Sequence, residues 1–298
     1  MPRQSSFSAT VNIATAPTGL LIPPSNTLIT YSLVSGGTSV AALFMAGYIP
    51  GILWGIGCML VAFFIAKKYG YRSTEKIEAK QAFKIAIDAL PALLLIVIVI
   101  GGIISGAFTA TEGSVVAVVY SFVLSLIYKT ITLKDMKEIL RDSAETTGII
   151  VFLIGVSSVM AWVMAFTGIP SAISSLLLGI SNNPVVILLI INLLLLFVGT
   201  FIDITPAILI FTPIFLPICK QFGMNEIQFG IMLTYNLCIG TITPPVGNIL
   251  FVGVKVAKVK LESVIKPLLP FYAVIFAVLM LVTFIPGISM VLPNLLGY

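Results

Sequence analysis

The chain has 298 residues, of which 59% are hydrophobic and only 9% are charged, with a mean hydropathy of +1.15. Soluble domains carry about a quarter charged residues, so this composition excludes a soluble globular protein and predicts an integral membrane protein. The sequence has no histidine, which excludes enzymes built on His triads or His–metal sites. The net charge of +5 then reports membrane topology and not nucleic-acid binding.

Apolar stretches recur along the chain, and a helix needs about 20 apolar residues to span a bilayer. In chain order, six candidate spans are residues 40–66, 85–107, 113–128, 148–167, 184–202 and 267–285. Three further stretches, 18–35, 206–219 and 229–253, are interrupted by prolines. Irregular backbone persists in a membrane only inside protein or beside a cavity, so these three predict discontinuous helices and re-entrant hairpins.

Positive charge is concentrated in three segments. Residues 67–84 carry six Lys or Arg, and 129–141 and 255–266 carry four each. The positive-inside rule places all three in the cytoplasm. Segments without Lys or Arg, 35–48, 168–184 and 286–298, are predicted on the opposite side. Segment 67–84 also contains acidic residues and is predicted to be an amphipathic linker helix on the membrane surface.

Two short segments of the sequence resemble each other. Each places a glycine four residues before a Pro-Pro pair: Gly19 before Pro23-Pro24, and Gly240 before Pro244-Pro245. The two copies are separated by a constant 221 residues. The span after the first copy ends in a basic cluster, whereas the span after the second begins in one, so the two cross the membrane in opposite directions. This pattern is an inverted repeat, which is typical of secondary transporters.

The repeat predicts the domain organisation. Residues 1–17 are the remnant of a first-repeat helix, and 18–66 are the second half of the first repeat, a broken helix plus a span. Residues 67–84 form the linker, and 85–298 form the second repeat, with a hairpin near 199–213 and a broken helix near 229–253. Most of the second repeat has no counterpart upstream. We therefore expect this chain to be the C-terminal part of a longer protein, the alternative being a repeat that grew asymmetrically.

The Pro-Pro pairs predict ion-binding sites. Proline lacks an N–H and its ring clashes with the carbonyl four residues earlier. The carbonyls expected to be freed are those of Gly19, Leu20, Gly240 and Thr241. A bare carbonyl in lipid costs several kcal/mol, and Na⁺ would satisfy it. The hydroxyls of Ser25, Thr241 and Thr243 add further oxygens. The alternative is a pair of proline kinks without a ligand.

A half-helix begins after each Pro-Pro pair, and its positive dipole end suits an anionic group of a substrate. The residues at these two ends are Ser25, Asn26, Gly247 and Asn248. Between the copies, Gly199, Asp203 and Thr205 lie in a polar break between two apolar runs. An acid at such a position indicates an ion site. Alternatively, Asp203 or Thr205 simply caps the helix that contains Pro206 in its first turn.

These motifs together resemble the large membrane subunit of tripartite ATP-independent periplasmic (TRAP) transporters, the DctM type. The resemblance extends from about Phe7 to the end of the chain. It rests on Gly-Leu-Leu-Ile-Pro-Pro-Ser (19–25), Gly-Ala-Phe-Thr-Ala-Thr-Glu (106–112), Gly-Thr-Phe-Ile-Asp (199–203) and Gly-Thr-Ile-Thr-Pro-Pro-Val-Gly (240–247).

The resemblance implies an all-α polytopic protein of the bacterial inner membrane, with an elevator-type inverted-repeat fold whose first repeat is incomplete here. It implies uptake of an organic acid coupled to Na⁺, with no cofactor and no covalent chemistry. It also implies two protein partners, a small membrane subunit and a periplasmic solute-binding protein, besides membrane lipid. Residues 19–25 and 240–243 correspond to unwound loops at cation sites, and 199–206 to the tip of the second hairpin.

Other functions remain open from the sequence. The chain is alternatively a stand-alone Na⁺/anion symporter, or a truncated remnant that does not transport. The hairpin of the first repeat is expected upstream of residue 1, so half of the first cation site is not expected in this chain. Dicarboxylates, sialic acids, sugar acids and keto acids all remain as substrates. A membrane enzyme is disfavoured, because no nucleophile–base pair or metal-ligand spacing occurs.

Overall fold

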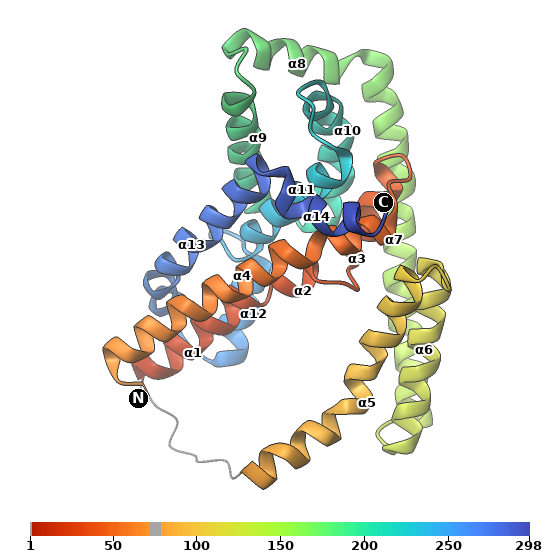
Figure 1. The fold of residues 1–298 in the computed structure, drawn as a ribbon, viewed down its shortest axis with the longest axis vertical. Helices are drawn as coiled ribbons and strands as arrows, with labels where there is room; N and C mark the ends of the chain where they lie inside the picture. The colour runs from red at the N-terminus through yellow and green to blue at the C-terminus, as the bar shows by residue number, and fades with distance from the viewer. Residues whose placement is uncertain (1, 72–78) are drawn as a thin grey trace. The chain divides into compact units, whose positions relative to one another are not determined.

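The computed structural model describes residues 2–71 and 79–298, and these residues form helices without any strand (Figure 1). The helices are α1 (Pro2–Thr15), α2 (Thr18–Leu21), α3 (Asn26–Val34), α4 (Val40–Tyr69), α5 (Ala79–Ile104), α6 (Ala110–Ile127), α7 (Leu133–Thr167), α8 (Ile169–Ile180), α9 (Pro184–Gly199), α10 (Ile204–Gln221), α11 (Glu226–Thr241), α12 (Asn248–Ala257), α13 (Leu261–Phe284) and α14 (Pro286–Leu295). The chain forms two compact units. The larger comprises residues up to Tyr71 and from Val156 onward, and the smaller comprises residues 72–155.

Within the described residues, six helices are long and apolar enough to cross a membrane: α4, α5, α6, α7, α10 and α13. Large apolar side chains are exposed along much of α5, α6 and α7. Water would penalise so much apolar surface, whereas a bilayer covers it. The predicted all-α polytopic membrane protein is therefore confirmed.

Two of the predicted segments differ from the structure. Residues 184–202 were expected to span, but α9 has only 16 residues and is about 24 Å long. Residues 206–219 were expected to be broken by proline, but α10 continues through Pro213 and Pro217. Neighbouring helices can re-satisfy the backbone groups that proline frees, and α10 packs against α3, α8, α9 and α11. The prolines therefore do not end this helix.

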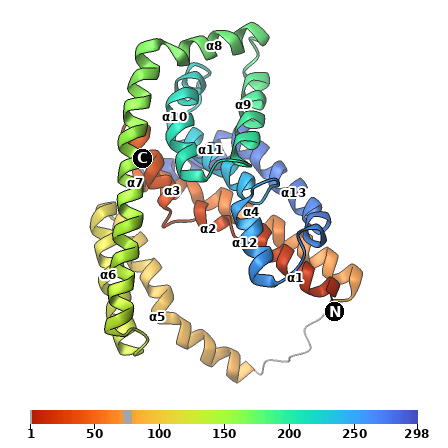
Figure 2. The same cartoon turned by 180° about the vertical axis from the view of Figure 1, so that it is seen from behind.

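The other two predicted interruptions are confirmed. The first Pro-Pro pair separates α2 from α3, and the second separates α11 from α12. Both Pro-Pro peptide bonds are cis. Between them in the sequence, α9 and α10 lie side by side as a hairpin whose tip is residues 200–203 (Figure 2). Of the predicted linker helix, residues 67–69 end α4 and 79–84 begin α5, while 72–78 lie outside the described residues.

The internal repeat is visible in how the helices of the larger unit pack. Helix α1 of the first copy contacts α12 and α13 of the second, and α11 of the second copy contacts α3 and α4 of the first. Figure 1 shows α1, α4 and α13 running beside one another. In each copy, a helix before the Pro-Pro pair (α1 or α11) therefore packs against the two helices that follow the Pro-Pro pair of the other copy.

Helix α11 is the centre of this unit, because every residue from Ile227 to Thr241 is buried. Aromatic side chains of the first copy hold it. The Tyr31 hydroxyl donates to the Glu226 carbonyl at 2.6 Å, and the Trp54 ring lies 4.7 Å from the Tyr235 ring. Gly230 leaves room for Tyr31, since a Cβ there would come within 2.4 Å of that ring. A helix buried on all sides needs largely apolar side chains, and partners for the polar ones that it carries.

Buried amides add polar contacts to the same helix. The Asn236 side-chain amide donates to the carbonyl and the side-chain oxygen of Asn192 on α9, at 3.0 and 2.8 Å. Asn192 in turn donates to the Thr283 hydroxyl on α13 at 3.3 Å. Interhelical hydrogen bonds of this kind hold membrane helices together where the hydrophobic effect cannot.

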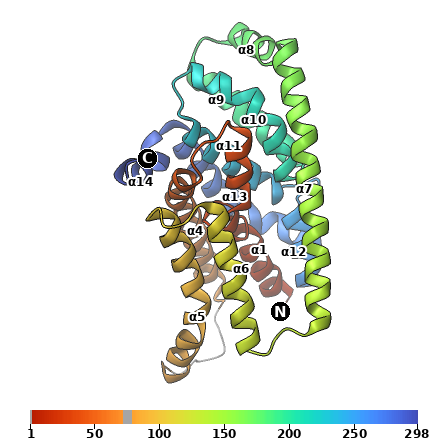
Figure 3. The ribbon, with the colours of Figure 1, turned by 90° about the vertical axis from the view of Figure 1, so that its right-hand side faces the viewer.

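The smaller unit is simpler. Helices α5 and α6 lie side by side (Figure 3), and the Tyr120 hydroxyl of α6 donates to the Pro91 carbonyl of α5 at 2.7 Å. A capping box begins α6, where Thr109 and Glu112 bond each other's backbone N–H. The interhelix turn is therefore fixed locally, by residues within it.

The packing of α11 predicts that Tyr31→Phe destabilises the larger unit by about 1 kcal/mol, because the part-buried Glu226 carbonyl loses a hydrogen bond. Thermal unfolding of the purified protein in detergent measures this change. Tyr298→Phe, at an exposed position near the C-terminus, is the control and should leave the transition unchanged. Equal transitions for the two variants would show that the Tyr31 hydroxyl does not stabilise α11.

Candidate functional site

The first Pro-Pro break gathers three oxygen atoms. Ser25 precedes α3 and its hydroxyl accepts from the Leu28 N–H, so it is the helix cap. The same hydroxyl donates to the Leu20 carbonyl. The Thr27 hydroxyl also donates to that carbonyl, at 2.8 Å, and lies 2.6 Å from the Ser25 hydroxyl. We call the Leu20 carbonyl with the Ser25 and Thr27 hydroxyls the first oxygen cluster.

This geometry corrects the expectation of a bare carbonyl at Leu20, since two side chains of the chain itself satisfy it. It also adds Thr27, which the sequence reasoning missed. The signal was a second hydroxyl residue two positions after Ser25, in the first turn of the new helix. Gly19 and Asn26 are exposed and outside the cluster, and a Cβ on Gly19 would meet no atom within 4 Å.

At the second break, the chain turns from α11 into α12 through residues 242–247. The expectation of a freed Gly240 carbonyl is wrong, because it accepts from the Thr243 N–H at 3.0 Å. The hydroxyls of Thr241 and Thr243 donate to carbonyls within α11, each at 2.7 Å. The last backbone hydrogen bond at this end therefore joins residues three apart instead of four, which is common at helix ends.

Gly247 completes this turn with φ of +32°, a left-handed conformation that favours glycine. A Cβ on Gly247 would lie 2.8 Å from the Thr243 carbonyl oxygen and 3.2 Å from that of Thr241. The carbonyls of Thr241 and Thr243 therefore converge on the inside of the turn, beside the first residue of α12.

The hairpin tip packs directly on the end of α11. A Cβ on Gly240 would come within 2.3 Å of the Gly199 carbonyl carbon, so the two backbones touch. Beyond the tip, the Asn248 side-chain amide donates to a carboxylate oxygen of Asp203 at 3.1 Å. Asp203 occupies the position before α10, but its side chain makes no cap hydrogen bond there. The capping interpretation of Asp203 is therefore wrong, and its carboxylate instead joins the hairpin tip to α12.

A small cavity of about 10 Å³ lies between the hairpin tip and the turn. Its walls are formed by Gly199, Thr200, Phe201, Ile202, Thr241, Val246, Gly247 and Asn248. A volume of this size holds about one water molecule or one ion of similar radius. Four residues singled out from the sequence, Gly199, Thr241, Gly247 and Asn248, thus meet at one place. Thr205 lies in the first turn of α10 and does not line this cavity.

The two breaks belong to the same packed core. Helix α11 contacts both α2 and α3, and the Cys238 sulfur lies 3.8 Å from the Pro17 carbonyl oxygen. The breaks are nevertheless chemically different. In the first, the hydroxyls follow the prolines, whereas in the second, Thr241 and Thr243 precede them.

The contact between the hairpin and α11 predicts a sharp difference between the equivalent glycines of the two copies. Gly240→Ala should lower the free energy of unfolding by about 1–3 kcal/mol, since the added methyl overlaps the Gly199 backbone. Gly19→Ala is the control, and its methyl meets open space. Chemical or thermal unfolding in detergent measures both variants. If Gly240→Ala were as stable as Gly19→Ala, the hairpin tip would not press on α11.

Comparison with known proteins supports a family assignment. Residues 3–288 match the family described as "Tripartite ATP-independent periplasmic transporter, DctM component". The chain is 52% identical to YgiK of Salmonella typhimurium, over 97% of this chain and 66% of that protein. It is 39% identical to the sialic acid TRAP transporter large permease protein SiaM of Vibrio cholerae, over 98% and 69%.

A similar match joins the chain to the C4-dicarboxylate TRAP transporter large permease protein DctM of Pseudomonas aeruginosa, 38% identical over 94% of this chain and 65% of that protein. The chain thus spans about two thirds of the length of these relatives. The match over nearly the whole chain, together with the two Pro-Pro breaks and the hairpin tip, shows that the chain belongs to the DctM family of TRAP transporter permeases.

Proposed function

We propose that the chain is the membrane component of a secondary transporter that imports an organic acid together with Na⁺. It is a multi-pass protein of the inner membrane and not an enzyme. Relatives are named for transport of sialic acid, C4-dicarboxylates and isethionate, all of which are acids. By the same likeness, the partners are a small membrane subunit and a periplasmic solute-binding protein that delivers the acid.

The single observation that carries the Na⁺ proposal is the cavity between the hairpin tip and the turn at Gly247. Thr241 and Gly247 line it, and the carbonyls of Thr241 and Thr243 converge on the same turn. Hard cations prefer several oxygen ligands of this kind. The Asp203 carboxylate, which accepts a hydrogen bond from the cavity-lining Asn248, adds negative charge and so favours a cation further.

The first oxygen cluster offers a second position for Na⁺. Its three oxygens come from one backbone carbonyl and two hydroxyls, and each hydroxyl oxygen keeps a lone pair after donating its hydrogen. Serine and threonine ligands carry no charge. Binding at this position would therefore depend on the number of oxygens and not on a carboxylate.

The acid itself fits the start of α3 better than the start of α12. Both are helix N-termini, which favour anions. At the start of α12, Asn248 already donates a hydrogen bond to the Asp203 carboxylate. The carboxylate of a substrate would be repelled there. The start of α3 has exposed Asn26, and no acidic residue lies between 2 and 71.

If Na⁺ binds in the cavity, it should stabilise the purified chain against heat, because a ligand that binds only the folded state raises the transition temperature. KCl at equal ionic strength is the reference and should have a smaller effect. Thr241→Val should weaken the apparent Na⁺ affinity by about tenfold or more, since the hydroxyl oxygen of this cavity-lining residue is lost while its carbonyl remains.

Thr234→Val is the matched control on the same helix. The Thr234 hydroxyl is buried without a hydrogen-bond partner, so its removal leaves both folding and Na⁺ binding intact. Equal stabilisation by KCl and NaCl would contradict Na⁺ binding to this chain. Equal Na⁺ affinity of Thr241→Val and Thr234→Val would contradict the cavity as its place.

Asp203→Asn tests the electrostatic part of the proposal. The substitution keeps the shape and an acceptor for Asn248 but removes the charge, so Na⁺ affinity should fall severalfold while the transition temperature in KCl changes little. Isothermal titration with NaCl, in choline chloride at constant ionic strength, measures the affinity. An unchanged affinity would show that the carboxylate plays no part in ion binding.

A further inference from the structure

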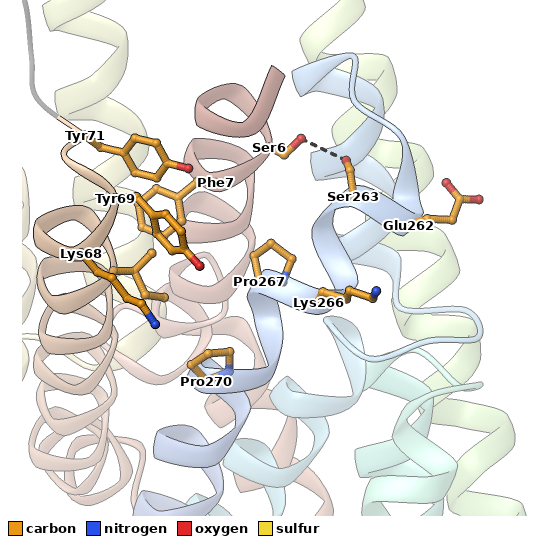
Figure 4. Close-up of a pocket in the computed structure, with 11 residues that line it drawn as sticks. Ser6, Phe7, Lys68, Tyr69, Tyr71, Glu262, Ser263, Lys266, Pro267 and Pro270 are labelled. Carbon is orange, nitrogen blue, oxygen red and sulfur yellow. Dashed lines mark hydrogen bonds between the residues drawn. The ribbon is translucent and has the colours of Figure 1, made fainter. Parts of the chain in front are cut away.

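A pocket of about 650 Å³ opens in the larger unit between α1, the end of α4 and the start of α13 (Figure 4). It is separate from both Pro-Pro breaks. Its wall on one side is a cluster of three rings, in which Tyr71 lies 5.3 Å from Phe7 and 5.8 Å from Tyr69. The rest of the lining is largely apolar and includes Ile65, Pro267 and Pro270.

Two lysines lie at opposite edges of the opening. Lys68 belongs to the end of α4 and Lys266 to the second turn of α13, and both are exposed (Figure 4). Among residues 2–71 and 79–298, neither ammonium lies within ion-pair distance of a carboxylate. Glu262 also lines the pocket, and in Figure 4 its carboxylate and the Lys266 ammonium both extend away from the three rings. The lining thus carries two positive charges, from Lys68 and Lys266, against one negative charge from Glu262, and its net charge is positive.

The position of the pocket relative to the membrane follows from the charges. Lys68 lies in the first basic cluster of the sequence and Lys266 in the third, so the fold brings two cytoplasmic clusters together around one opening. Tyrosines are common at the level of lipid headgroups. The cytoplasmic leaflet is also the one whose anionic lipids attract basic residues near the ends of membrane helices.

We propose that this pocket binds an anionic phospholipid, with its phosphate paired to Lys68 and Lys266 and an acyl chain along the apolar lining. The long lysine stems allow either ammonium to reach a phosphate from the edge of the opening. A soluble phosphate would use the lysines but leave the apolar lining unoccupied. A zwitterionic lipid would fill the lining but gain less from the two cations. A bound lipid would tie α1 and α4 of the first copy to α13 of the second.

Native mass spectrometry of the purified chain, titrated with phosphatidylglycerol in detergent, measures the binding. At about 1 kcal/mol for each lysine, Lys68→Gln and Lys266→Gln should each weaken binding roughly fivefold, and the double variant roughly thirtyfold. Phosphatidylcholine should bind more weakly than phosphatidylglycerol to the unmodified chain, and about equally to the unmodified chain and the double variant.

Lys67→Gln with Lys260→Gln is the matched control. It removes the same charge from the same two clusters at exposed positions that do not line the pocket, so phosphatidylglycerol affinity should stay within about twofold. Equal loss in the two double variants would show a diffuse charge effect and overturn the site. Displacement of the lipid by millimolar glycerol 3-phosphate would overturn the assignment to a lipid and show a soluble-phosphate site instead.

Discussion

A membrane interior supplies no water to hydrogen-bond exposed backbone, so every break in a helix must be satisfied by the protein itself. The two Pro-Pro pairs impose that requirement twice. At the first break, the hydroxyls of Ser25 and Thr27 donate hydrogen bonds to the Leu20 carbonyl. At the second break the chain uses a tightened turn, in which the Thr243 N–H bonds the Gly240 carbonyl. The Leu20 carbonyl with the Ser25 and Thr27 hydroxyls, gathered in this way, is also the position proposed above for a second Na⁺.

The packing of the two copies against each other places both breaks in contact with one helix, α11. Helix α1 packs on α12 and α13, and α11 packs on α3 and α4, which buries α11 from Ile227 to Thr241. The Gly199–Gly240 contact then brings the hairpin tip against the second break with no side chain between them. Close approach of backbones at glycine is the usual way in which membrane helices pack tightly.

The copies are not interchangeable, and the difference is electrostatic. The second break has the Asp203 carboxylate bonded to Asn248, whereas the first has only neutral oxygens. A cation is therefore favoured most strongly at the second break, and an anion is disfavoured there unless a cation accompanies it. The proposed Na⁺ position at the second break and the proposed acid position at the start of α3 therefore differ in charge.

The sequence by itself determined the membrane class, both Pro-Pro breaks and the family resemblance, because each depends on composition or on residues a few positions apart. It misjudged 184–202 and the proline-containing α10, since burial among neighbours decides whether a helix tolerates proline. Only the tertiary structure showed that Asp203 bonds Asn248 and does not cap α10, and that Thr27 joins the first oxygen cluster. It alone brought Lys68 and Lys266 around one pocket. Such contacts join residues distant in sequence, or depend on which of several nearby partners a side chain selects, and packing makes that choice.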